Sequence, residues 1–231
     1  MAANLEFKVA RRLERFKLVE RVMNSHRRRL VLNEFQFLQN FEPSFVGFDW
    51  IKSAHRRYVA DVSSTEMAVS LNTVCLLLAF CEKMQPSSIL DLGSGFSSFA
   101  LRSYARQKHD VKVYSVDDNQ EWLRKTGDFL SASGLSTKNL MTWDEFRKSD
   151  LKDFELVFHD LGSMELRAQA LPDVLGRVKP ASGVLILDDM HKPDYACFVG
   201  ASLQGRRLNH LNLKPFTIDE IGRYAHLVTG I

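Results

Sequence analysis

The chain has 231 residues, of which 45% are hydrophobic and 26% are charged, and its formal net charge is +3. These values are ordinary for a globular protein and exclude disordered, collagen-like and membrane-embedded classes. Its three cysteines form no paired framework, and the longest apolar run, residues 74–81, is too short to span a bilayer. The composition therefore predicts a cytoplasmic protein with one large α/β domain, an extension and no membrane span.

The first 62 residues are interpreted as that extension. Residues 1–30 carry nine Lys or Arg and three Glu, and apolar residues between Leu5 and Met23 recur at helical spacing. This pattern predicts a basic amphipathic helix, which either packs over the main domain with a solvated face or docks an anionic partner. The basic residues are not interleaved with aromatic ones, so RNA is not the predicted partner. A homodimer through the N-terminal helices is a further prediction.

Residues 41–62 are rich in aromatic residues and include Pro43 and Gly47. We expect them to form an irregular connector between the extension and the domain that begins at residue 63. Long connectors in compact domains are often functional. The connector is therefore either a lid over a site or a packing strap.

A strand, a glycine turn and a helix start are encoded by residues 88–101. A short apolar run interrupted only by Asp91 precedes Gly93 and Gly95, and a helical pattern follows. Glycines let the backbone turn tightly, and free N–H groups at a helix start offer hydrogen bonds, so this unit is typical of nucleotide-like ligands. Ser98 stands where a dinucleotide fingerprint has its third glycine, which disfavours NAD.

The order of an acid, two glycines and a small residue resembles the first motif of class I S-adenosylmethionine-dependent methyltransferases, with Asp91, Gly93, Gly95 and Ser97 on the pattern. Ser97 departs from the glycine that is common there. The resemblance implies that these residues hold the methionine part of S-adenosylmethionine. N-capping residues at positions 63–66 predict a helix that leads into the motif, and its likeness to small-molecule O-methyltransferases implies that Glu66 faces the cofactor.

The second predicted strand, residues 111–116, ends in Asp117 and Asp118. A carboxylate at this position can accept hydrogen bonds from both hydroxyls of a ribose, so we predict Asp117 as the ribose partner with Asp118 beside it. Capping of the next helix is the alternative role. Trp143 and Asp144 follow a short strand around residues 139–142. The resemblance implies that they border the adenine ring, and their alternative role is to begin a helix.

Two further predicted strands, residues 154–158 and 183–187, also end in acids. The first leads into Asp160, and the second leads into Asp188 and Asp189. Parallel strands gather ligands at their carboxyl ends, and carboxylate oxygens suit Mg²⁺. The arrangement resembles the metal-dependent catechol-type O-methyltransferases, which implies that these three residues hold Mg²⁺. Asp189 replaces an asparagine of that family, and the family's lysine after the first aspartate is missing.

The reaction side is predicted to contain Asp160, Asp188 and His191. With a metal, the acceptor hydroxyl would be bound and its pKa lowered; without one, His191 or His159 would act as general base. His191 is preferred because it follows the acidic pair at the expected substrate rim. A structural role is the alternative for either histidine.

Repeated strand–helix–strand units predict a Rossmann-like, doubly wound α/β fold with a mostly parallel seven-stranded sheet. Residues 210–218 and 224–229 predict an antiparallel C-terminal hairpin, as in the methyltransferase fold. The expected organisation is a helical extension at 1–62 and a cofactor-binding domain at 63–231. The resemblance implies S-adenosylmethionine-dependent methyl transfer to a hydroxyl oxygen of a small molecule, with Mg²⁺ assisting if it binds. The alternatives are an NAD-dependent oxidoreductase and a non-catalytic module that docks through the basic helix.

Overall fold

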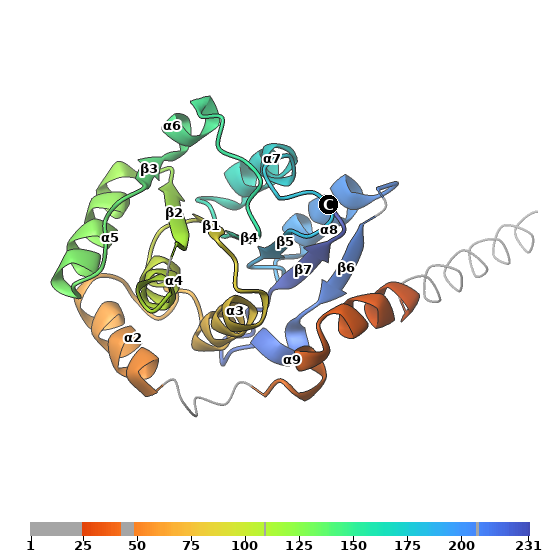
Figure 1. Ribbon diagram of the computed structural model, residues 1–231, viewed down its shortest axis with the longest axis horizontal. Coiled ribbons are helices and arrows are strands. Elements are labelled where there is room, and N and C mark those ends of the chain that lie inside the picture. Colours follow the sequence, from red (N-terminus) through yellow and green to blue (C-terminus); the bar gives the residue numbers. More distant parts are fainter. Residues whose placement is uncertain (1–24, 43–48, 109, 207) are drawn as a thin grey trace, which may run out of the picture.

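The computed structural model describes residues 25–42, 49–108, 110–206 and 208–231 (Figure 1). The expected basic helix between residues 5 and 23, and with it the predicted dimer contact, lies outside these residues. Residues 25–34 are helical, and the 3-10 helix η1 (Gln36–Asn40) follows. None of the helices within the described ranges has the length and apolar character that crossing a lipid bilayer requires.

Seven strands form one mixed sheet. They are β1 (Ser88–Leu92), β2 (Lys112–Asp117), β3 (Leu140–Thr142), β4 (Leu156–His159), β5 (Val184–Leu187), β6 (Asn209–Asn212) and β7 (His226–Thr229). The strand order is β3-β2-β1-β4-β5-β7-β6. Strands β1 to β5 run parallel, whereas β7 is antiparallel to both β5 and β6. The predicted fold class, including the antiparallel C-terminal hairpin, is confirmed.

Helices cover both faces of the sheet (Figure 1). They are α2 (Asp49–Asp61), α3 (Leu71–Met84), α4 (Phe96–Arg106), α5 (Gln120–Ala132), α6 (Trp143–Lys148), α7 (Met164–Leu175), α8 (Pro193–Leu203) and α9 (Lys214–Thr217). Because side chains alternate along a strand, each strand supplies both faces. Ile89 packs with the layer of α2 to α5, whereas its neighbour Leu90 packs with the layer of α6 to α8.

The expected irregular connector contains a regular helix. Residues 43–48 lie outside the description, but 49–61 form α2. Ile51, Ala54 and Tyr58 are buried and lie on one face of this helix, against α3 and α4. The prediction of irregular structure was therefore wrong for 49–61, because three core contacts at helical spacing outweigh the polar residues between them. The domain division at residue 62 stays a prediction. Residues of α2 lie in one hydrophobic core with those of α3 to α5, on the other side of that division.

Two other element boundaries differ from expectation. The helix expected from residue 63 begins at Leu71, with Ser70 as its N-cap and its hydroxyl oxygen accepting from the Thr73 N–H at 3.1 Å. Residues 63–69 are therefore a loop before the helix. In the C-terminal hairpin, the expected first strand is shorter, because the helix α9 occupies its second half and contains Pro215, which cannot donate to a strand ladder.

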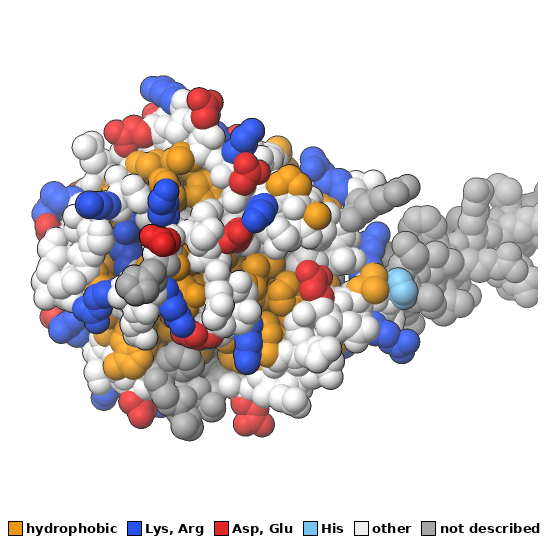
Figure 2. All heavy atoms as spheres, viewed as in Figure 1, with side chains coloured by type: hydrophobic (Ala, Val, Ile, Leu, Met, Phe, Trp, Pro, Cys, Tyr) orange, Lys and Arg blue, Asp and Glu red, His pale blue; other side chains and the backbone are white. Residues whose placement is uncertain are grey.

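The surface carries charges of both signs. Figure 2 shows acidic and basic side chains interspersed over one face, with apolar areas between them. The basic side chains on the described part of this face are therefore not gathered into a single stripe.

Candidate functional site

A cavity of about 450 Å³ opens where β1, β2, β4 and β5 end. This is the edge at which doubly wound sheets bind ligands. The predicted site residues that line it are Glu66, Gly93, Asp117, Asp118, Asp160, Asp188 and Asp189. The strand-end carboxylates and the glycine turn thus meet in one place, as the topology requires.

The glycine turn brings two strand ends into close contact. Gly93 has a φ of +95°, and its N–H donates to the carbonyl of Val116 at 2.8 Å. A Cβ added at Gly93 would lie 2.3 Å from the carbonyl oxygen of Asp160. Neither the backbone angle nor the space admits another residue. With no side chain at Gly93, the backbone of the turn lines the cavity directly.

The other residues of the predicted motif lie behind the cavity. Asp91 is fully buried, and one of its carboxylate oxygens accepts from the hydroxyl of Ser98. Burial raises the pKa of Asp91 to about 6, against the opposing effect of that bond. Gly95 packs near the hydroxyl of Tyr58, and Ser97 is buried. These positions support the turn from within, and their proposed contact with the cofactor has no direct support in the geometry.

The two aspartates after β2 differ in their surroundings. Asp117 is buried, and its Oδ2 accepts from the N–H and hydroxyl of Ser94 at 2.8 and 2.9 Å. Its Oδ1 accepts from the N–H of Asn119 at 2.9 Å. Burial raises the pKa of Asp117 against these bonds. Asp118 is exposed and lines the same cavity, with its carboxylate beside Gly162. Asp117 organises the loop, whereas Asp118 presents its carboxylate to the cavity.

The predicted adenine contacts do not line the cavity. Trp143 is buried and stacks on Phe146 at 5.8 Å, while the exposed Asp144 pairs with Arg147. Both begin α6, which is the alternative role that the sequence left open. Trp122 of α5 lines the cavity instead, and its Nε1–H donates to the carbonyl of Ser94 at 2.6 Å.

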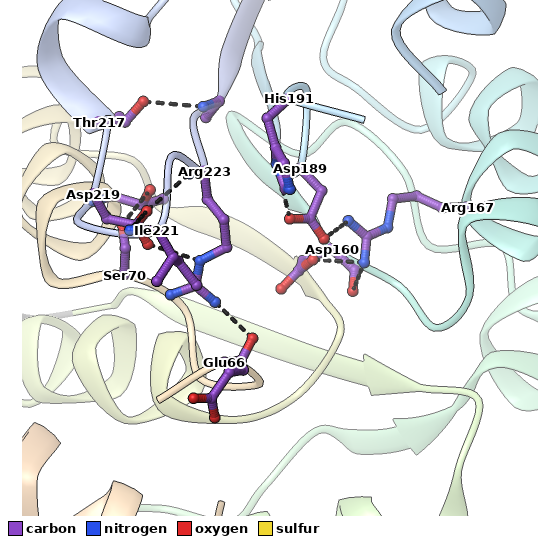
Figure 3. A network of polar contacts seen from close by, with 12 residues as sticks. Glu66, Ser70, Asp160, Arg167, Asp189, His191, Thr217, Asp219, Ile221 and Arg223 are labelled. Atoms are coloured by element: carbon purple, nitrogen blue, oxygen red, sulfur yellow. Dashed lines mark hydrogen bonds and ion pairs between the residues drawn. The ribbon is translucent and has the colours of Figure 1, made fainter. Parts of the chain in front are cut away.

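An arginine lies between the acids that were predicted to hold a metal ion. Arg167 of α7 contacts Asp160 at 2.6 Å and Asp189 at 3.0 Å, and its side chain is 4% exposed (Figure 3). Burial raises the pKa of Asp160, with Arg167 opposing the shift. Asp188 is buried beside them, and burial together with Asp189 raises its pKa to about 6.

The predicted magnesium site is not supported by this arrangement. Across the described ranges, no group of three or more His, Cys, Asp or Glu side chains is arranged to hold a metal ion. Two of the three predicted ligands, Asp160 and Asp189, share a guanidinium instead. The residues present therefore do not fit Mg²⁺, because a second cation would meet the positive charge of Arg167.

The two candidate histidines lie in different surroundings. His191 is half-buried, and its Nδ1 lies 3.5 Å from Oδ1 of Asp189. Burial lowers the pKa of His191, with Asp189 opposing the shift, so the ring is neutral near pH 7. His159 is fully buried, and its Nε2–H donates to the carbonyl of Arg167 at 2.9 Å. Burial lowers the pKa of His159 to about 3. The structural role therefore fits His159. His191 does not line the cavity itself but lies against Asp189, which does, and its role as the base stays a prediction.

A second arginine holds the loop in which Glu66 lies. Arg223, in the turn before β7, donates to the carbonyls of Glu66 at 2.8 Å and Ala68 at 3.0 Å (Figure 3). Its Nε donates to Asp219 at 2.7 Å. Four consecutive residues of this loop, 66–69, line the cavity. Arg223 therefore fastens one wall of the cavity to the C-terminal hairpin, and Glu66 lies on that wall with its side chain exposed.

Three residues of the cavity were not among the predicted site residues, namely Trp122, Arg167 and Arg223. One of them carried a usable signal: Arg167 lies in line with Ala170, Leu171 and Val174, which form the buried face of α7. A charged residue at an apolar position of an amphipathic helix indicates a buried ion pair. Trp122 lies in α5 and Arg223 lies in the turn before β7. Neither shows a sequence pattern that separates it from ordinary surface residues.

Comparisons with known proteins bear on the fold. No protein-family model matches the sequence. A search of curated proteins also gives no match. Solved structures do match. The O-methyltransferase TomG from Streptomyces achromogenes, involved in tomaymycin synthesis and solved with SAM, is 14% identical with a TM-score of 0.58, over 78% of this chain and 88% of that one.

Two further structures agree. An O-methyltransferase from Bacillus cereus, solved with SAH, is 14% identical with a TM-score of 0.59, over 77% of this chain and 88% of that one. The SAH-bound methyltransferase PaMTH1 from Podospora anserina is 12% identical with a TM-score of 0.60, over 78% and 87%. The chain has the class I methyltransferase fold. Within this methyltransferase fold, the acidic cavity lies at the edge of the sheet that also carries the glycine turn.

Proposed function

We propose that the protein transfers a methyl group from S-adenosylmethionine to a hydroxyl oxygen of a small molecule. The observation that carries the proposal is the cavity at the strand ends, where the tight turn at Gly93 meets the acidic residues after β2, β4 and β5. Its volume of about 450 Å³ lies within the range of small-molecule sites. The O-methyltransferases of the same fold support the reaction class.

The residues present fit this cofactor. Gly93 and Ser94 line the cavity, where the absence of a side chain at Gly93 suits close approach of the methionine part. The carboxylate of Asp118 suits the ribose hydroxyls, with Asp117 holding the loop beside it. Negative charge around the cavity also favours a positively charged sulfur. The cofactor, when bound, supplies a methyl group that is already activated by that charge. What this chain must add is orientation of the acceptor and a base for its proton.

His191 is the proposed base. A hydroxyl that gains a methyl group at oxygen must lose its proton, and a neutral imidazole can take it. Burial lowers the pKa of His191, which keeps the ring neutral near pH 7. The carboxylate of Asp189, 3.5 Å from Nδ1, is placed to orient the ring and to stabilise the charged form after the transfer. Asp160 and Asp188 are proposed to shape the reaction side around it.

Calorimetric titration with S-adenosylmethionine tests the proposal, with NAD⁺ as the competing ligand. We expect binding of S-adenosylmethionine with a Kd on the order of 1–100 µM and no heat from NAD⁺. Asp118→Asn should weaken binding about tenfold, because a neutral amide accepts fewer hydrogen bonds from a ribose. Asp128→Asn is the matched control, since Asp128 is an exposed acid of α5 that pairs with Arg124 outside this cavity.

The outcomes separate the alternatives. Binding of NAD⁺ in place of S-adenosylmethionine would favour an oxidoreductase. Silence with both ligands would overturn the enzyme proposal and favour a non-catalytic module. Equal loss in Asp118→Asn and Asp128→Asn would show that the ribose is held elsewhere. Incubation of the loaded enzyme with hydroxylated small molecules, followed by detection of methylated products, then tests the acceptor class.

A further inference from the structure

Arg167 is enclosed by acceptors from the ends of β4 and β5. Its Nη2 lies 2.6 Å from Oδ1 of Asp160, and its Nη1 lies 3.0 Å from Oδ2 of Asp189. Nη2 also donates to the carbonyls of Asp160 at 3.0 Å and Gly162 at 3.2 Å. Figure 3 shows the guanidinium entering from α7 toward both carboxylates. Its charge is thus shared between the two strand ends that close the reaction side of the cavity.

The arginine is held firmly in this place. It lies in the first turn of α7, where its N–H donates to the carbonyl of Ser163 at 2.8 Å. Its own carbonyl accepts from the ring of His159 at 2.9 Å. The ring of Tyr195 lies 5.8 Å from the guanidinium carbon, which adds a cation–π contact. Contacts with the start of its own helix, with the end of β4 and with α8 therefore hold the arginine in one position.

A divalent ion bridging these strand ends would need the same oxygens. Mg²⁺ and Mn²⁺ bind carboxylate oxygens at close range and require several ligands around the ion. The facing oxygens of Asp160 and Asp189 are already engaged by Arg167. Placing a divalent ion between them would set two cations within a few ångströms, with little water to screen them. Either the guanidinium or the ion can occupy the gap.

We propose that the guanidinium of Arg167 is the resident cation of this acidic rim and takes the position that a divalent metal would otherwise hold. The consequence for catalysis, which rests on the proposed function, is that methyl transfer by this protein needs no metal. Arginine stays protonated at working pH, so it can neither coordinate a hydroxyl as a metal ion does nor accept its proton. The acceptor's proton must therefore go to a side chain, and the candidate is His191, which lies against the cavity-lining Asp189.

Metal binding tests the first part without any cofactor or turnover. The full-length protein is stripped with a chelator and titrated with Mn²⁺, followed by electron paramagnetic resonance and by thermal unfolding. We expect wild type to bind no Mn²⁺ at this rim and to keep its Tm on addition of the ion. Arg167→Met removes the charge but keeps an apolar stem, so it should gain one Mn²⁺ site and a Tm increase of about 5 °C at saturation.

Arg177→Met is the matched control. Arg177 is another half-enclosed arginine, which donates to the carbonyls of Ser149 and Leu151 and pairs with Asp173 away from the cavity. Its replacement should destabilise the protein without creating a response to Mn²⁺. The double variant Arg167→Met with Asp160→Asn should lose the gained site, which places the ion at the rim.

Two results would overturn the inference. One is a Mn²⁺ site in wild type that disappears in Asp160→Asn. The other is a folded Arg167→Met protein that binds no Mn²⁺. If Arg167→Met does not fold with or without Mn²⁺, Arg167→Gln, which keeps an amide donor for the backbone carbonyls, is measured in its place and the same outcomes apply. Because S-adenosylmethionine binding is measured separately, failure of this inference is distinguishable from failure of the proposed function.

Discussion

At the scale of single residues, Gly93 is expected to be the most sensitive position of the turn. Gly93→Ala forces a left-handed backbone angle on a residue with a Cβ, which costs about 1–2 kcal/mol. It also sets that Cβ 2.3 Å from the Asp160 carbonyl, so the strand ends must move apart. We expect a total loss of about 3 kcal/mol or more in unfolding free energy, measured by urea denaturation, together with loss of S-adenosylmethionine binding.

Gly134→Ala is the control for this substitution. Gly134 also has a positive φ, of +66°, but an added Cβ there would meet no atom within 4 Å. It should therefore show the backbone cost alone, about 1–2 kcal/mol, with cofactor binding unchanged. Equal effects of the two variants would show that the close approach at Gly93 contributes nothing to the turn.

Single residues also show where sequence reasoning succeeds and where it stops. The positions of Asp160, Asp188 and Asp189 at one edge followed from strand ends alone, since parallel strands share that edge. The position of the strand ends did not predict which cation these carboxylates contact. Arg167 reaches them from the next helix, and only the packing of α7 on the sheet determines where its side chain points. Asp91 illustrates the converse, because its motif position predicts a ligand contact while its carboxylate is buried against Ser98.

At the scale of elements, the loop at residues 65–69 depends on the C-terminal hairpin. Arg223 donates to the carbonyls of Thr65, Glu66 and Ala68, so it holds the loop as a wall of the cavity. Arg223→Met should release the loop, and ordering it again would then oppose ligand binding. We expect S-adenosylmethionine affinity to fall about tenfold in calorimetric titration, with a smaller change in Tm.

The closest internal match is again Arg177. Both arginines bind carbonyls of a distant loop and pair with an aspartate four residues earlier, but Arg177 lies outside the cavity. Arg177→Met should therefore lower Tm without weakening the binding of S-adenosylmethionine. If both variants lower the affinity for S-adenosylmethionine equally, general destabilisation rather than release of the loop would explain the effect of Arg223→Met.

Elements were predicted well where their pattern is strong. The buried strands and the glycine turn are recognisable in the sequence, because each apolar run is followed closely by glycine or aspartate residues. The start of α3 did not, because Ser70 competes with several capping residues at 63–66, and the choice depends on how Arg223 binds that loop. Helix α2 was missed although Ile51, Ala54 and Tyr58 are correctly spaced, since three apolar positions among charged ones are a weak signal before their partners are known.

At the scale of the whole molecule, burial shifts the pKa values of carboxyl groups and histidines in opposite directions. The two kinds of group therefore have opposite effects on folding stability in acid. Burial raises the pKa of Asp91 and Asp188 to about 6, so these carboxyls take up protons more readily in the folded state than in the unfolded state. Below pH 6 they therefore contribute stability. Burial lowers the pKa of His159 and His226 to about 3, which has the opposite sign, because the unfolded chain takes up those protons first. The total curve mixes both effects.

The difference between wild type and His226→Phe isolates one histidine. Nδ1 of His226 lies 2.6 Å from Nε2 of His210 between β6 and β7, so a neutral pair can share one hydrogen bond, while a second proton would disrupt it. His226→Phe keeps a ring beside Tyr224 and loses that bond. At neutral pH the variant should be less stable by about 1 kcal/mol.

As the pH falls from 6.5 toward 3, wild type loses its advantage over this variant. In this pH range His226 binds a proton in the unfolded chain but stays neutral in the folded one. The unfolding free energy of wild type therefore falls relative to that of His226→Phe, by up to about 1.4 kcal/mol per pH unit. Urea denaturation at a series of pH values measures it. His26→Phe, a replacement of the same kind at an exposed position, is the control variant measured over the same pH series. A constant difference between wild type and His226→Phe across this range would mean that His226 binds its proton equally well in the folded and the unfolded state, and would contradict this prediction.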